Sequence, residues 1–145
     1  TAMPIAPPLP LALVAALLTV VATSTQAGLR VTIDLSDQQM TVERDGRPLH
    51  VWPVSTAREG KCTPVGTYRP VTLKRMHHST LYDGAPMPFS IFFSGNYAIH
   101  GTTETERLGA PASAGCVRLH PANAETLFGY VLDEGKAATE IVIRP

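Results

Sequence analysis

The residues of this sequence most suited to chemistry are a cysteine and a histidine in its C-terminal half. Cys116 lies in the stretch SAGCVRL, and His100 ends the stretch NYAIH. An unperturbed thiol has a pKa of about 8.5, so only a few per cent of it is nucleophilic thiolate near neutral pH. A neighbouring imidazole can take the thiol proton, and the resulting ion pair is the active form. The two side chains therefore predict a cysteine nucleophile with a histidine base.

The segment that joins them, residues 101–115, has the composition of a functional loop. It shows no apolar periodicity and reaches the ~12 to 15 residues beyond which structureless loops are uncommon in compact domains. Gly101 lets backbone approach the base, while Gly115, with Ser113 nearby, permits a turn that aims N–H groups at a developing oxyanion. Arg118 adds a positive charge suited to a carboxylate. Spacing alone is not specific, however, and a cysteine that only packs remains the alternative.

A mainly β domain with one substantial helix is expected to position this pair. Alternating apolar and polar residues, separated by turn residues, predict strands. These strands cover residues 29–35, 39–44, 48–57, 66–76, 88–95, 96–101 and 139–145. Residues 57–67 and 76–88 are expected to form loops, the second of them a polar flap. The helix is predicted to follow His120, with Pro121 in its first turn, and to stop at Gly135.

The alternation also predicts which side chains share a face. Val31 and Ile33 are expected to point inward from the first strand. In the third strand Leu49 and Val51 share one face, and Trp52 falls on the other.

Length and charge narrow the class of protein. The 145 residues and 44% hydrophobic content predict one domain with a real core. The 12 basic and 12 acidic residues balance, which gives no electrostatic reason to expect nucleic acid as a partner.

Residues 1–27 form a separate segment, because they contain no charged residue, histidine, cysteine or aromatic residue. Their apolar run from Leu9 to Ala22 is shorter than the ~20 residues of a membrane-spanning helix. We interpret the segment as a signal peptide cleaved after Ala27, with an uncleaved anchor as the alternative. Residues 28–145 would then form the exported domain, a monomer in the periplasm or cell envelope with no stable membrane insertion after cleavage.

The stretch AIHGTTETERLGAPASAGCVRL resembles the core of the L,D-transpeptidase catalytic domain, the YkuD-type family of bacterial cell-wall enzymes. CTPVGTY, MPFSIFF and PANAETLF resemble further segments of that family, so the likeness covers roughly residues 29–145. It implies a β-sandwich-like fold with a helix after the catalytic cysteine. It also implies Cys116 as nucleophile, His100 as base, and the carbonyl of Gly101 as the group that orients the imidazole.

The resemblance further implies that peptidoglycan stem peptides are the substrate and that no metal or organic cofactor is needed. Water in place of the amine acceptor would give L,D-carboxypeptidase side activity. One position departs from the pattern, since Ala114 replaces the histidine that usually stands two residues before the cysteine. This departure leaves either a working variant with altered geometry or a catalytically weak peptidoglycan-binding module. A sortase-like transpeptidase is a further alternative, because sortases also carry a His, a Cys and an Arg in this order.

The remaining candidates are the second cysteine and residues of the polar flap. Cys62 could pair with Cys116 or, if Cys116 is the nucleophile, stand alone as a small buried residue. Tyr82 and Met87 could line a cleft or anchor the flap. The spacing of the other histidines fits no zinc pattern, and no metal site is expected; they are His50, His77, His78 and His120.

Overall fold

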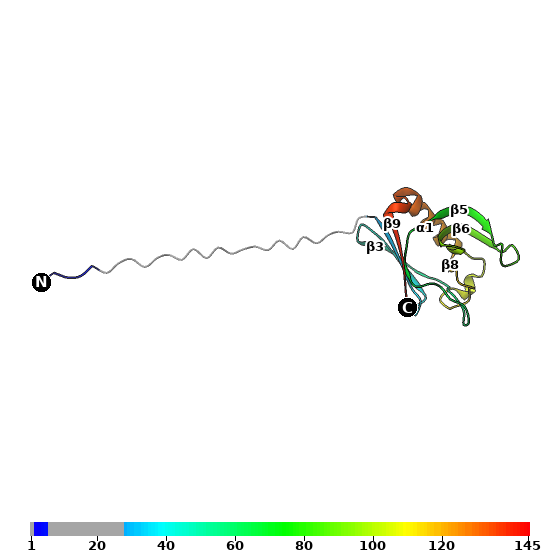
Figure 1. Ribbon diagram of the computed structural model, residues 1–145, viewed down its shortest axis with the longest axis horizontal. Coiled ribbons are helices and arrows are strands. Elements are labelled where there is room, and N and C mark those ends of the chain that lie inside the picture. Colours follow the sequence, from blue (N-terminus) through cyan, green and yellow to red (C-terminus); the bar gives the residue numbers. More distant parts are fainter. Residues whose placement is uncertain (1, 6–27) are drawn as a thin grey trace.

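The computed structural model describes residues 2–5 and 28–145. Over these residues the fold consists of two mixed β-sheets and one α-helix (Figure 1). The predicted signal peptide falls, apart from residues 2–5, outside the described residues. Within the described ranges no helix is long and apolar enough to cross a membrane.

The first sheet has five strands in the order β3-β2-β1-β9-β4. They are β1 (Leu29–Asp34), β2 (Gln39–Arg44), β3 (Arg47–Pro53), β4 (Gly66–Tyr68) and β9 (Thr139–Arg144). β1, β2 and β3 form an antiparallel meander, as the short turns predict. The last strand, β9, runs parallel to β1, with Val31 opposite Ile141.

The second sheet has four strands in the order β5-β6-β7-β8. They are β5 (Thr72–His78), β6 (Pro86–Ser94), β7 (Tyr97–Gly101) and β8 (Val117–Leu119). β5, β6 and β7 pair antiparallel, whereas β7 and β8 are parallel and are joined by the long loop that the sequence predicts. That loop contains one 3-10 turn, η1 (Thr105–Arg107).

Helix α1 (Pro121–Glu134) packs on β6 and β7 and also touches β1. It begins at the predicted position because the His120 side chain accepts a hydrogen bond from the Ala122 N–H, and Pro121 fills the first helical position. It ends at Gly135, and η2 (Lys136–Ala138) leads from there into β9. The hydrophobic core collects apolar side chains of both sheets and of the inner face of α1.

The third strand has the faces that the alternation predicts: Leu49 and Val51 share an exposed face, and Trp52 is buried on the other. Two other sequence expectations are wrong in detail. Residues 66–76 form two strands in different sheets, since the chain breaks near Pro70. The flap is shorter than expected, because β5 continues to His78 and β6 already starts at Pro86.

Candidate active site

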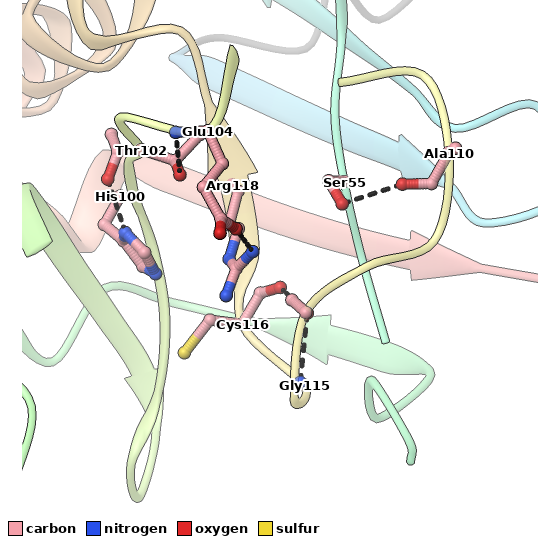
Figure 2. Close-up of polar contacts among 10 residues, drawn as sticks. Ser55, His100, Thr102, Glu104, Ala110, Gly115, Cys116 and Arg118 are labelled. Atoms are coloured by element: carbon pink, nitrogen blue, oxygen red, sulfur yellow. Dashed lines mark hydrogen bonds and ion pairs between the residues drawn. The ribbon is translucent and has the colours of Figure 1, made fainter. Parts of the chain in front are cut away.

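Strand pairing brings the predicted nucleophile and base together. In the parallel pair of β7 and β8, His100 lies opposite Arg118, so these residues point to the same face of the sheet. Cys116 precedes Arg118 by two residues, and side chains alternate with a period of two, so the thiol is directed to that face as well. Figure 2 shows the Cys116 sulfur and the His100 ring on the same side of the two segments.

A pocket of about 590 Å³ opens on this face. Four of the six predicted site residues line it, namely His100, Ser113, Cys116 and Arg118, and so does Ala114; Gly101 and Gly115 do not. Residues of β5, the flap and β6 also line it, among them Tyr82 of the flap and Met87 of β6. Of the two roles left open for Tyr82 and Met87, the lining of a cleft is the one observed.

The ring of His100 is held in one orientation by the next residue. Its Nδ1 lies 2.7 Å from the carbonyl oxygen of Gly101, and a carbonyl only accepts, so Nδ1 carries the proton. The unprotonated Nε2 is therefore the nitrogen available as a base. A side chain at Gly101 would be crowded, because a Cβ there would lie 3.0 Å from Pro88 Cγ and 3.2 Å from the Cα of Pro121. Glycine lets β7 pass this close to the start of α1 without a shift of either proline.

Burial keeps both reactive groups neutral in the resting site. His100 is 6% exposed, and desolvation lowers its pKa to about 4, although the Gly101 hydrogen bond acts in the opposite direction. Charges on Arg118 and His77 lower the pKa of His100 further. Burial also raises the pKa of the Cys116 thiol, against smaller lowering effects from the Ala98 backbone and Arg118. The expected resting ion pair is therefore not the stable form, so any attack by the sulfur would require transfer of the thiol proton in the same step.

The loop before Cys116 is closed by its own hydrogen bonds. The Ser113 hydroxyl donates to the Cys116 carbonyl at 2.6 Å and accepts from the Gly115 N–H at 3.0 Å (Figure 2). Gly115 has a φ of 143°, and a Cβ on it would lie 2.6 Å from the Tyr97 ring. Glycine is therefore required at this turn. In this arrangement the Gly115 N–H is engaged, so an oxyanion role for it requires the Ser113 contact to open.

A second segment that the sequence singled out holds the same loop from outside. Thr63, in CTPVGTY, is 4% exposed. Its hydroxyl donates to the Gly115 carbonyl at 2.8 Å and accepts from the Ala57 N–H at 3.0 Å. The contribution of this segment is thus structural support for the turn that carries Cys116.

Arg118 has a partner that sequence reasoning missed. Its Nη1 lies 2.9 Å from the Glu104 carboxylate, and both residues line the pocket (Figure 2). The Glu104 side chain is 49% exposed and lies in a loop without periodicity, so no signal in the sequence marked it. The ion pair offsets the positive charge that was expected to receive a substrate carboxylate.

The other candidates have different roles or none. Cys62 is exposed and unpaired, so its interpretation as a buried residue is wrong. His50 contacts the Tyr130 hydroxyl at 2.8 Å and stacks on Trp52. His77 lines the pocket. Among the described residues no group of three or more His, Cys, Asp or Glu side chains is placed to hold a metal ion.

The comparison with family models gives the family of this domain. Residues 28–143 match the YkuD family, L,D-transpeptidase catalytic domain. The chain belongs to that family. This membership excludes the sortase-like alternative and confirms the resemblance found in the sequence. A search of curated proteins found no match.

Solved structures of other L,D-transpeptidases share the fold. One from Mycobacterium smegmatis aligns with a TM-score of 0.73 and 21% identity, over 82% of this chain and 59% of that one. One from Xylanimonas cellulosilytica aligns with a TM-score of 0.66 and 27% identity, over 83% of this chain and 62% of that one. L,D-transpeptidase 3 from Mycobacterium tuberculosis, in complex with a faropenem-derived adduct, aligns with a TM-score of 0.68 and 19% identity, over 81% and 60%. This L,D-transpeptidase domain thus spans less than two thirds of each.

Proposed function

We propose that the chain is a cysteine L,D-transpeptidase that acts on peptidoglycan stem peptides through a thioester on Cys116. The observation that carries the proposal is that the Cys116 thiol lines the same pocket as His100, whose Nδ1 is held by the Gly101 carbonyl so that Nε2 is left to accept a proton. Family membership supports the reaction class. The proposed donor is a tetrapeptide stem, cleaved after its third residue.

Acylation follows from the protonation states of the site. As Cys116 Sγ forms a bond to the donor carbonyl carbon, its proton passes to Nε2 of His100. The Gly101 carbonyl stabilises the imidazolium that forms, because Nδ1–H stays directed at it. N–H groups of the 113–116 loop are proposed to hold the oxyanion. The tetrahedral intermediate then expels the D-alanine amine, which takes the proton from Nε2, and a thioester remains.

Deacylation reverses the roles. An acceptor amine attacks the thioester carbon and gives a proton to Nε2 of His100. The carbon–sulfur bond breaks, and the thiolate regains its proton from the imidazolium. Water as the acceptor would release the free stem, which is L,D-carboxypeptidase activity.

The proposed substrate also sets the proposed surroundings of the enzyme. Peptidoglycan lies outside the cytoplasmic membrane, so we propose export to the periplasm or cell envelope, with action as a monomer and without a cofactor. A fusion of residues 1–27 to a reporter enzyme that is active only after export tests this part. Activity of the reporter supports export, and its retention in the cytoplasm contradicts it.

Turnover tests the function directly. Purified chain incubated with a tetrapeptide stem donor and an amine acceptor is expected to release D-alanine and to give cross-linked product, both measured by mass spectrometry. Cys116→Ala is expected to give neither. Because Ala114 lines the pocket where the usual histidine would stand, Ala114→His is the informative second variant. No turnover by the natural chain, with turnover restored by Ala114→His, would favour the weak binding module.

A further inference from the structure

The turn between β1 and β2 carries a buried glutamine whose side-chain amide forms hydrogen bonds through both its nitrogen and its oxygen. Gln38 is 4% exposed, and its φ of 51° is in the left-handed region that residues with side chains seldom adopt. Nε2 donates to the Leu35 carbonyl at 2.8 Å and to the Thr56 hydroxyl at 2.6 Å. Oε1 accepts from the Thr56 N–H at 3.0 Å. Two of these three bonds fix the position of Thr56.

Thr56 in turn holds the loop of the second sheet. Its carbonyl accepts from the N–H groups of Ala112 and Ser113, at 3.0 and 2.8 Å. Val54, two residues earlier, also contacts both the β1–β2 turn and the loop. Its N–H donates to the Gln38 carbonyl, and its carbonyl accepts from the Gly109 N–H. The segment after β3 therefore connects the β1–β2 turn to the loop before the nucleophile.

The last link reaches the nucleophile itself. Ser113 closes the turn through its bonds to Gly115 and to the Cys116 carbonyl. Gln38, Thr56 and Ser113 are all less than 5% exposed. Buried hydrogen bonds of this kind are costly to break, because water does not replace the lost partner. A continuous line of such bonds thus joins an amide in the first sheet to the backbone of Cys116.

We infer that Gln38 is a positioning residue for the nucleophile. It lines no part of the pocket and acts through Thr56 and Ser113, which set the place of the Cys116 backbone and so the approach of Sγ to Nε2 of His100. Displacement of a reacting atom by about 1 Å can slow a reaction about 100-fold. This inference rests on the proposed role of Cys116.

Neighbouring glutamines provide a matched pair of variants. Gln39 is exposed at the start of β2, next to the buried Gln38. In a Cys62→Ser background, which leaves one thiol, Gln38→Ala is expected to slow acylation of Cys116 by faropenem roughly 10- to 100-fold. Gln39→Ala is expected to stay within about two-fold of the parent. Circular dichroism and a thermal melt give the folded fraction of each variant.

Conservative variants separate positioning from general stability. Gln38→Glu keeps the acceptor for the Thr56 N–H but loses both donated bonds, so an intermediate rate is expected. If Gln38→Ala does not fold, Gln38→Glu and Thr56→Val carry the test. Combined with Ser113→Ala, Gln38→Ala is expected to give less than the product of the two single effects, because both interrupt one line of bonds.

Three results would overturn the inference. The first is an unchanged acylation rate in folded Gln38→Ala, and the second is a loss of rate no larger than the fraction of Gln38→Ala that is unfolded. The third is a double variant with Ser113→Ala whose loss of rate equals the product of the two single losses. Alkylation of the single thiol by iodoacetamide across pH serves as a readout that needs no transpeptidase chemistry. A parent that iodoacetamide alkylates but faropenem does not acylate would count against the proposed function. The alkylation profiles of parent and Gln38→Ala would then decide the inference, with a changed profile supporting it and an identical one contradicting it.

Discussion

At the scale of single residues, the burial of His100 predicts an unusual pH dependence. The base must be neutral to take the thiol proton, and its pKa is lowered to about 4. The rate of Cys116 acylation by faropenem should therefore hold from pH 7 down to about 5 and fall only as pH approaches 4. A stopped-flow series, with circular dichroism to verify the fold at each pH, measures this. A fall centred near 6.5, the value of an exposed imidazole, would contradict the account.

The ion pair between Glu104 and Arg118 predicts a change in the selectivity of the thiol. Glu104→Gln removes the carboxylate but keeps the size of the side chain, so Arg118 faces the pocket with an uncompensated charge. The ratio of alkylation rates with anionic iodoacetate and neutral iodoacetamide should rise about two- to five-fold at low salt. Glu106→Gln, in the exposed η1 turn of the same loop, is the control and should leave the ratio unchanged. Equal ratios in both variants would show that Arg118 is not the charge that a substrate meets.

Residues whose type suggests chemistry could be singled out from the sequence, and residues that matter through their partners could not. Cys116 and His100 stand out because a thiol and an imidazole at the ends of a long loop suggest a reaction. Glu104 and Gln38 do not, since one lies in an aperiodic loop and the proposed role of the other depends on a hydrogen bond to a residue far along the chain. Nothing in the residue type of either one marks such a contact.

At the scale of elements, the turn before Cys116 predicts different losses of stability for two glycine substitutions. Gly115→Ala and Gly109→Ala both place a side chain at positive φ, but only Gly115 is crowded, with Tyr97 2.6 Å and the Cys62 carbonyl 3.0 Å from the new Cβ. Gly109 has nothing within 4 Å. The shared backbone strain should cost each variant about 1 kcal/mol or more, measured by urea unfolding.

The crowding should lower the stability of Gly115→Ala further, because the turn that carries Cys116 must shift. The same shift should slow acylation by faropenem roughly 10-fold or more. Gly109→Ala should acylate at nearly the natural rate. Equal stability and equal rates in the two variants would contradict the fit described for this turn.

Most elements could be predicted from local patterns, while the boundaries of some strands and the buried face of β3 could not. The β1–β2 and β6–β7 hairpins and α1 follow from alternation, turn residues and the cap at His120. In β3, alternation separates Leu49 and Val51 from Trp52, but it does not say which face is buried, because both faces carry apolar residues. Packing of the sheet against the core decides that.

At the scale of the whole molecule, the site depends on pairing between distant parts of the chain. β1 and β9 are parallel neighbours from opposite ends of the domain, and periodicity carries no information on such a partner. The order of strands in the two sheets is therefore known from the structure and not from the pattern. The same buried site also links folding to pH.

The His100 pKa, about 4 in the folded chain and near 6.5 when unfolded, means that the unfolded state binds more protons between these values. Stability should be unaffected by His100 above about pH 7 and should fall by about 3 kcal/mol as pH drops to 4. Urea unfolding of the natural chain and of His100→Gln at several pH values measures this. His100→Gln should not show the loss of stability that His100 causes between pH 7 and 4. Parallel curves of stability against pH for the two chains would contradict the burial of a neutral imidazole.

The central claim is that Cys116 forms the covalent intermediate with His100 as its base. The most direct measurement is mass spectrometry of the chain after reaction with a tetrapeptide stem or with faropenem, followed by digestion to locate the adduct. The account predicts an adduct on the peptide that contains Cys116, none in Cys116→Ala, and formation slowed roughly 10²- to 10⁴-fold in folded His100→Ala. Both substitutions together should cost no more than Cys116→Ala alone, because nucleophile and base act as a unit. An adduct on Cys62, or acylation of His100→Ala at the natural rate, would contradict it.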